Sequence, residues 1–211
     1  APAKPGTTIW AAITQTIAPG WHTYWRNPGD SGLATSVSWN LPRGVSAGAP
    51  LWPAPQRFDD GGIVNYGYAN EATILVPLKV ARGATSGMVK AHIFLLECEH
   101  MCIPENVTLD LDLSKSSGLP ALFAAARANV PRPFHGAANV AIDAKTLTLT
   151  LTDPRFSHIR ASDMHFYPAT TGAVDYDAAP SLHIDGDTLI WQAARDAHAK
   201  KFAALDRKSV A

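Results

Sequence analysis

Apolar and polar residues alternate along much of the first half of the chain, the pattern of β-strands with one face in a core. The alternation predicts strands at residues 8–17, 35–41, 74–80, 88–98 and 107–113. Segment 88–98 is the longest and most apolar, so we expect a central strand there. Pro77 has no N–H for a sheet ladder, which predicts that 74–80 is an edge strand. The strands follow one another without helix-length segments, which indicates an antiparallel sandwich.

The second half begins with the one segment that has a helical pattern. Residues 120–129 are rich in alanine, with Pro120 in the first turn and Pro131 just beyond the end. Further strands are expected at residues 140–142, 146–152, 164–167, 182–184 and 188–193, with a hairpin turn at 185–187. The Pro-rich connector 131–134 predicts a boundary between a domain at residues 1–130 and a smaller one at 135–211. The expected fold class is all-β: two antiparallel β-sandwich domains with one short connecting helix.

Composition narrows the possible functions. Lys plus Arg and Asp plus Glu each number 18, so no net charge favours nucleic acid or an anionic membrane surface. No apolar run approaches the ~20 residues of a transmembrane helix. The first residues show neither a basic nor an apolar signal region, so we expect any signal peptide to have been removed already. Few charged residues and many prolines and glycines favour a β-rich exported protein.

The only two cysteines, Cys98 and Cys102, are separated by three residues. A bond between them closes almost no loop and makes a poor structural staple, but close thiols make a good redox couple. On one extended strand their Cα atoms would be about 13 Å apart, beyond disulfide reach, so the chain must turn back between them. Cys98 ends the most apolar strand and should be the more buried. Cys102 follows the turn and is expected to be the exchange-active thiol.

Other interpretations of this segment remain open. The two cysteines could be inert residues of an interaction module, or a purely structural pair. Alternatively, Cys98, His100, Met101 and Cys102 are soft or borderline ligands that suit monovalent copper.

Charged residues near the cysteines affect the stability of a thiolate. Glu97, Glu99 and Glu105 disfavour a thiolate, whereas a protonated His100 favours one, and no lysine or arginine lies in the loop. This environment is typical of a pair that passes electrons onward as a reductant.

Several longer motifs occur in order along residues 20–105: Gly20 to Gly32 (GWHTYWRNPGDSG), Trp52-Pro53, Tyr66-Gly67-Tyr68, and Cys98 to Glu105 (CEHMCIPE). They resemble the N-terminal periplasmic domain of the DsbD family of thiol:disulfide interchange proteins, especially the branch of the suppressor of copper sensitivity protein B (ScsB). Residues 135–211 carry no matching motif, although a second immunoglobulin-like module suits that branch.

The resemblance implies an immunoglobulin-like domain whose cysteine pair, here Cys98 and Cys102, is the redox couple. In this family the domain takes electrons from a membrane-embedded domain through a thioredoxin-like domain and reduces periplasmic thioredoxin-fold proteins. The second cysteine, here Cys102, forms the mixed disulfide, and Cys98 resolves it. The resemblance implies no flavin, nicotinamide or metal cofactor, a monomer in the periplasm, and a link to copper tolerance.

The chain also departs from the better-studied DsbD branch. That branch has a wider cysteine spacing and an aromatic cap residue just before its Tyr-Gly, where this chain has Asn65. We expect residues 65–68 to form a loop whose tyrosines, Tyr66 or Tyr68, could take over the role of the cap. Together with His100, Glu97 and Glu105 they are candidate modulators or partner contacts. The membrane and thioredoxin-like domains are not among these 211 residues, which suggests an excised module.

Overall fold

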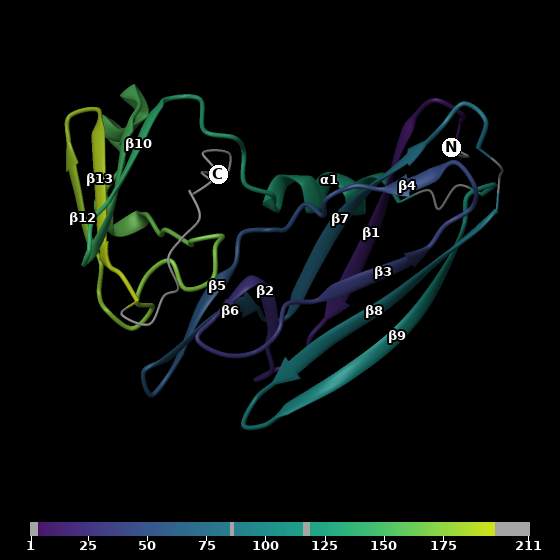
Figure 1. Ribbon diagram of the computed structural model, residues 1–211, viewed down its shortest axis with the longest axis horizontal. Helices are drawn as coiled ribbons and strands as arrows, with labels where there is room; N and C mark the ends of the chain where they lie inside the picture. Colours follow the sequence, from purple (N-terminus) through teal and green to yellow (C-terminus); the bar gives the residue numbers. More distant parts are fainter. Residues whose placement is uncertain (1–3, 85–86, 116–118, 197–211) are drawn as a thin grey trace. The chain divides into compact units, whose positions relative to one another are not determined.

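The computed structural model describes residues 4–84, 87–115 and 119–196 (Figure 1). Its first half consists of strands, as the alternation predicts. They are β1 (Thr8–Thr16), β2 (Thr23–Gly29), β3 (Ser36–Asn40), β4 (Val45–Ala47), β5 (Gln56–Asp60), β6 (Ile63–Tyr68), β7 (Glu71–Val80), β8 (Met88–Cys98) and β9 (Cys102–Asp112). The expected all-β, antiparallel fold class is confirmed.

Contacts between residues divide the chain into two compact units. The first comprises Ala1–Arg26, Gly32–Gln56 and Gly67–Pro131, and the second comprises Asn27–Ser31, Arg57–Tyr66 and Arg132–Ala211. The chain thus changes unit after Pro131 and also at four earlier points, three of which lie within strands, namely β2, β5 and β6. The division into domains at residues 1–130 and 135–211 stays a prediction.

The first unit has its core between two three-stranded antiparallel sheets, ordered β1-β7-β4 and β3-β8-β9. Alternate residues of the central strands β7 and β8 point into this core, and Leu78 and Val89 are almost fully buried there. Because successive side chains in a strand face opposite sides, the alternation in the sequence identifies the core face directly. The prediction that 88–98 is a central strand is confirmed.

The prediction that residues 74–80 form an edge strand is wrong, because β7 lies between β1 and β4. Pro77 is tolerated at this central position because its missing N–H falls where the neighbouring ladder is interrupted. Strand β4 ends at Ala47, the Pro77 carbonyl accepts a hydrogen bond from the Gly48 N–H, and pairing resumes only at Leu51. An interruption of this kind serves the same purpose as an edge.

Helix α1 spans Pro120–Asn129, the bounds predicted from its alanines and flanking prolines. The Arg127 guanidinium lies over the Trp10 ring of β1, 4.3 Å from the ring centroid, which fixes the helix against the first sheet. In the part of the chain that the structure describes, no helix is long and apolar enough to cross a membrane.

The second unit contains a four-stranded antiparallel sheet ordered β10-β11-β13-β12. Its strands are β10 (Ala137–Ile142), β11 (Thr146–Thr152), β12 (Ser181–Asp185) and β13 (Thr188–Ala194). Asp185 pairs with Thr188, so the predicted hairpin turn is confirmed. The strand expected at residues 164–167 is wrong: these residues follow two short 3₁₀ turns, η1 (Pro154–His158) and η2 (Ala161–Asp163), and pair with no strand.

Gly67 of β6 lies so close to Thr23 of β2 that a Cβ atom would overlap the Thr23 carbonyl oxygen. We predict that Gly67→Ala lowers the free energy of unfolding by ~3 kcal/mol, because buried backbone must move to accept the methyl group. Gly83→Ala is the matched control, since its Cβ would have no neighbour within 4 Å. Denaturant unfolding of both variants measures the difference, and equal midpoints would contradict the close approach.

Candidate functional site

The candidate site lies at the tip of the β8–β9 hairpin, where Cys98 and Cys102 form a disulfide. The two residues are direct cross-strand partners with Cα atoms 4.1 Å apart. The chain turns back within Glu99–Met101, so the turn required by the cysteine spacing is confirmed. The disulfide is therefore held by the register of two eleven-residue strands.

The residue preceding β2 fixes the Cys98 end of the hairpin. His22 and Cys98 form an isolated antiparallel bridge, in which each backbone N–H donates to the other's carbonyl oxygen at 2.9 Å. The His22 ring is partly buried, and this burial lowers the pKa of its imidazole. The backbone of Cys98 thus has its hydrogen-bonding partners on the side of β8 that faces away from Cys102.

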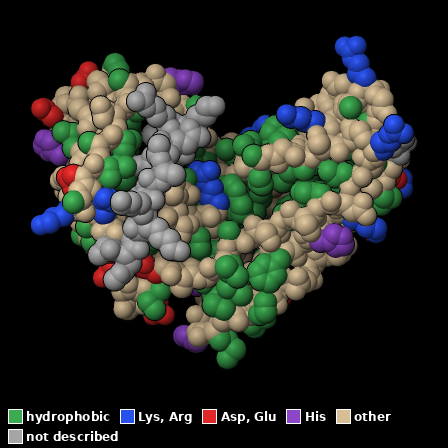
Figure 2. All heavy atoms as spheres, viewed as in Figure 1, with side chains coloured by type: hydrophobic (Ala, Val, Ile, Leu, Met, Phe, Trp, Pro, Cys, Tyr) green, Lys and Arg blue, Asp and Glu red, His purple; other side chains and the backbone are tan. Residues whose placement is uncertain are grey.

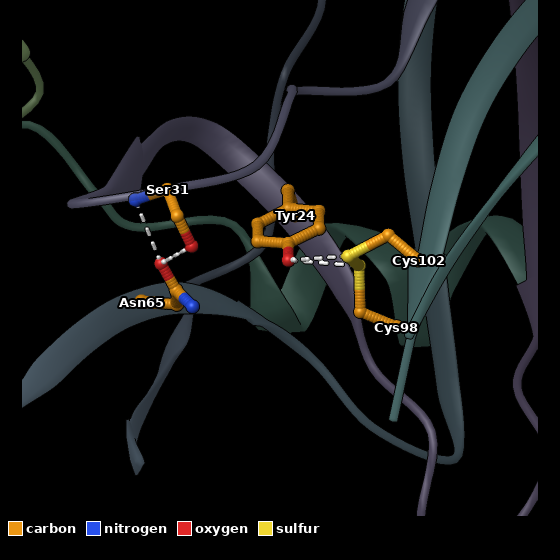
Figure 3. The surroundings of a disulfide bond; sticks show 5 residues. All are labelled: Tyr24, Ser31, Asn65, Cys98 and Cys102. Atoms are coloured by element: carbon orange, nitrogen blue, oxygen red, sulfur yellow. Dashed lines mark hydrogen bonds between the residues drawn. A yellow bond between two sulfur atoms is a disulfide. The ribbon is translucent and has the colours of Figure 1, made fainter. Parts of the chain in front are cut away.

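Tyr24 of β2 directs its hydroxyl group at the disulfide (Figure 3). The hydroxyl donates a hydrogen bond to Cys98 Sγ at 2.9 Å and lies 3.7 Å from Cys102 Sγ. The ring is only 2% exposed and packs edge-on against His22. On its other side lies Gly32, where a Cβ atom would overlap the ring. A glycine at position 32 is therefore required for this placement of Tyr24.

The two sulfurs differ in their access to solvent. Cys98 is 3% exposed, whereas Cys102 is an exposed residue, as their positions in the sequence predict. Met101 and Ile103 beside Cys102 are 70% and 43% exposed. Hydrophobic side chains accordingly gather at the tip of the β8–β9 hairpin in Figure 2. Cys102 is therefore the more accessible of the two cysteines.

Glutamates flank the two cysteines in the sequence. Glu97 is half-buried beside Cys98, and this burial raises the pKa of its carboxyl group, which the Glu105 charge raises further. Glu99 and His100 are exposed in the turn. Between Ala91 and Ser114 the sequence has no lysine or arginine. This segment of the chain therefore supplies no lysine or arginine to stabilise a thiolate.

Tyr66 and Tyr68, the residues expected to replace the aromatic cap, do not lie in a loop. Residues 65–68 belong to strand β6 instead of an exposed loop, and both tyrosines are buried. Tyr66 packs edge-on against Tyr167 and Tyr176, and the Tyr68 hydroxyl donates to the Pro53 carbonyl. Burial raises the pKa of both hydroxyls.

Asn65, which stands at the cap position, is likewise engaged within its own unit. Its side-chain oxygen accepts hydrogen bonds from the Ser31 N–H and hydroxyl (Figure 3). The hydroxyl group that contacts the sulfurs is that of Tyr24, and the cap role of Tyr66 or Tyr68 stays a prediction.

Within the described residues, no cluster of three or more His, Cys, Asp or Glu side chains is arranged to hold a metal ion. Both sulfurs of the copper set, Cys98 and Cys102, are joined in the disulfide, with His100 and Met101 exposed beside them. A copper site formed by these four residues in the reduced protein stays a prediction.

Tyr24 is the functional candidate that the sequence did not reveal. It lies in the motif Gly20 to Gly32, which the sequence analysis used only for the family resemblance. The missing information was the bridge between His22 and Cys98, which brings the beginning of β2 to the end of β8 across 76 residues of sequence. Once this bridge is known, the position of Tyr24 two residues after His22 indicates that its side chain lies near Cys98.

Comparisons with solved structures and with protein families both find proteins similar to this chain. The crystal structure of the N-terminal periplasmic domain of ScsB from Proteus mirabilis is similar, with a TM-score of 0.68 and 26% sequence identity over 90% of this chain and 76% of that chain. A search of curated proteins finds no match.

The family described as "Thiol:disulfide interchange protein DsbD, N-terminal" matches residues 1–114, more than half of the chain and the whole of the disulfide site. An exposed sulfur, joined to a buried one at a hairpin tip, is suited to the exchange reaction that this family's description names. The chain therefore belongs to the family of the DsbD N-terminal domain and is a thiol:disulfide exchange module.

Proposed function

We propose that this module is a periplasmic protein-disulfide reductase, which passes electrons from a membrane reductase to periplasmic thioredoxin-fold proteins through the Cys98–Cys102 pair. The observation that carries the proposal is the asymmetry of the site: an exposed Cys102 sulfur and a buried Cys98 sulfur that accepts a hydrogen bond from Tyr24. The electron donor would be a thioredoxin-like domain of the parent protein. The similarity to a periplasmic ScsB domain supports the compartment.

Reduction of the oxidised module begins with attack on Cys102. A donor thiolate forms a bond to Cys102 Sγ while the Cys98–Cys102 bond breaks, and the bonding electrons leave on Cys98 as a thiolate. A second donor thiolate then attacks the donor sulfur of this mixed disulfide and releases the Cys102 thiolate. Two electrons and, after protonation, two protons have entered the module. The donor leaves as a disulfide.

Delivery to a substrate is the reverse sequence. The Cys102 thiolate attacks the substrate disulfide and releases one substrate thiolate. The Cys98 thiolate then attacks Cys102 Sγ, which reforms the disulfide and releases the second substrate thiolate. Cys98 becomes a buried thiolate when the module is reduced, and it begins as one when the module reduces a substrate. In both reactions the Tyr24 hydroxyl, 2.9 Å from Cys98 Sγ, is placed to donate a hydrogen bond to it. Such charge-assisted hydrogen bonds are stronger than neutral ones.

The electrostatics favour a reductant over an oxidant. Strong oxidants of this class owe their potential to a stabilised thiolate in the reduced form. Here Glu97, Glu99 and Glu105 flank the cysteines in the sequence, without lysine or arginine between Ala91 and Ser114. The reduced pair is consequently less stabilised and gives up its electrons more readily. This supports transfer from the module to a substrate disulfide.

The roles of the two sulfurs can be tested with single variants and an oxidised thioredoxin-fold protein. We expect reduced Cys98→Ala to accumulate a mixed disulfide through Cys102, because the resolving thiol is missing. Cys102→Ala should trap little, because its remaining sulfur is buried. Non-reducing electrophoresis measures both. Preferential trapping by Cys102→Ala would reverse the roles, and absence of exchange by the wild-type protein would remove the proposed function.

The contribution of Tyr24 can be tested by removing its hydroxyl group. We predict that Tyr24→Phe slows reduction of the disulfide by dithiothreitol about tenfold, because the leaving Cys98 thiolate loses a hydrogen bond of ~1.4 kcal/mol. Tyr68→Phe is the matched control, since it also loses a buried hydroxyl, whose hydrogen bond goes to Pro53. Its rate should stay within about twofold of wild type. Equal rates for the two variants would contradict the role of Tyr24.

A further inference from the structure

The two faces of the β8–β9 hairpin carry different side chains near the disulfide. Successive side chains of a strand point to opposite faces, and residues paired directly across two strands point to the same one. The cross-strand pairs that share the face of Cys98 and Cys102 are Leu96–Pro104, Phe94–Asn106 and His92–Thr108. We call this the sulfur face. It is the outer face of the sheet, since the alternate residues of β8, among them Ile93 and Leu95, lie in the core.

The sulfur face is apolar and uncharged beside the disulfide. Leu96 and Phe94 are half-buried there, and Pro104 is exposed. Figure 2 shows hydrophobic side chains gathered at this end of the hairpin. Among the paired residues of this face that the structure describes, the first Lys, Arg, Asp or Glu side chains are the Lys90–Asp110 ion pair. Lys90 lies eight residues before Cys98, about 26 Å along the strand.

The opposite face carries the charges of the hairpin tip. Glu97 pairs with Ile103, and Glu105 pairs with Leu95, so both carboxylates point away from the sulfur face. A partner that covered them would have to remove water from two carboxylates, which costs free energy unless each receives a new partner. Covering the sulfur face beside the disulfide requires no such desolvation of a charge.

A mixed disulfide at Cys102 sets how far a partner extends over this face. The bond holds the two Cα atoms within ~4.4–6.8 Å of each other. A standard interface covers ~800 Å² on each protein, which corresponds to a disc of about 16 Å radius. At ~3.3 Å per residue, Leu96 lies about 7 Å and Phe94 about 13 Å from the disulfide, inside such a disc. Met88, about 33 Å away, lies outside it.

A shallow hollow beside Phe94 marks the outer part of this area. Its volume is about 270 Å³, and on the sulfur face it is lined by Ser36, Ser38, His92, Phe94, Asn106 and Thr108. The lining is polar apart from Phe94, and its hydroxyl, amide and imidazole groups can form hydrogen bonds. An apolar centre with a polar rim is the usual arrangement of a protein–protein interface. The sulfur face has this arrangement, with Cys102 beside the apolar part.

We propose that the thioredoxin-fold partner docks on the sulfur face, with an uncharged, apolar surface beside its reactive cysteine packed against Leu96, Pro104 and Phe94. The proposal rests on the proposed function, whose exchange steps it leaves unchanged. It adds which face of the hairpin the partner covers and what its surface must be. A cysteine at the N-terminus of a helix, where its thiol pKa is lowered, can approach Cys102 while the surface around it covers this face.

Serine substitutions on the two faces separate the sulfur face from its alternatives. The measurement is the second-order rate constant for reduction of the oxidised module by reduced thioredoxin. Phe94→Ser should lower it about tenfold and Leu96→Ser about fivefold, because apolar anchors near the centre carry most of an interface's binding free energy. Met88→Ser, on the same strand and face but outside the disc, and Ile103→Ser, on the opposite face, are the controls. Both residues are exposed, and both rates should stay within about twofold of wild type.

A gain in rate provides a test that loss of structure cannot imitate. Asn106 is exposed opposite Phe94, and Asn106→Leu extends the apolar part of the sulfur face. This variant should react with thioredoxin about threefold faster than wild type. Reduction by dithiothreitol, which covers no surface beyond the disulfide, should be the same for all these variants and wild type.

Each other outcome contradicts the proposal or its basis. Wild-type rates with thioredoxin for Phe94→Ser and Leu96→Ser would overturn docking on the sulfur face. Slowing of Ile103→Ser to the extent of Leu96→Ser would overturn the choice of face. Equal slowing with thioredoxin and dithiothreitol would place the cause in the disulfide and also overturn it. A wild-type module that reacts with dithiothreitol but not with thioredoxin would instead show that the proposed function has failed.

A trapped complex locates the partner directly. Cys98→Ala is joined through Cys102 to a thioredoxin whose second cysteine is replaced by serine, and methyl NMR signals are compared with those of Cys98→Ala joined to glutathione. This reference removes the effect of the mixed disulfide itself. The Leu96 methyl signals should shift between the two adducts, whereas the Met88 and Ile103 methyl signals should not. Unshifted Leu96 signals, or shifts confined to Ile103, would overturn the proposal.

Discussion

The backbone bridge between His22 and Cys98 is the interaction on which the site depends. It attaches the beginning of β2 to the end of β8, and so places Tyr24 against the disulfide. It also occupies the N–H and C=O of Cys98, which makes Cys98 and Cys102 a closely spaced, non-hydrogen-bonded pair. This one bridge thus determines which sulfur is buried, which hydroxyl contacts it, and which way the backbone of Cys102 points.

The asymmetry of the disulfide follows from the difference between a central and an edge strand. Strand β8 has neighbours on both sides, and Cys98 at its end pairs with His22 and is contacted by the Tyr24 hydroxyl. Among the strands that the structure describes, β9 has a neighbour only on the side of β8, and Cys102 is exposed. A shared disulfide between such strands has one sulfur that partners reach and one that only the protein itself contacts. This division of roles matches the needs of a two-step exchange.

Local pattern was sufficient to predict much of this fold. The alternation in residues 88–98, the turn required between Cys98 and Cys102, and helix α1 are all present as expected. The failures have a common physical origin in contacts between distant segments. Pro77 suggested an edge strand because the interruption of the ladder beside it cannot be seen in the sequence. Tyr66 and Tyr68 suggested an exposed loop because their burial depends on partners such as Tyr176 and Pro53.

The central claim is that Cys102 is the sulfur that exchanges with partners and Cys98 the one that leaves and resolves. The most direct measurement uses the oxidised wild-type module, a limiting amount of reduced glutathione, rapid alkylation of free thiols, and fragment-ion mapping of the 91–114 segment. The account predicts glutathione on Cys102 and the alkyl group on Cys98 in nearly all mixed-disulfide molecules. Glutathione found mainly on Cys98, or equally on both sulfurs, would contradict it.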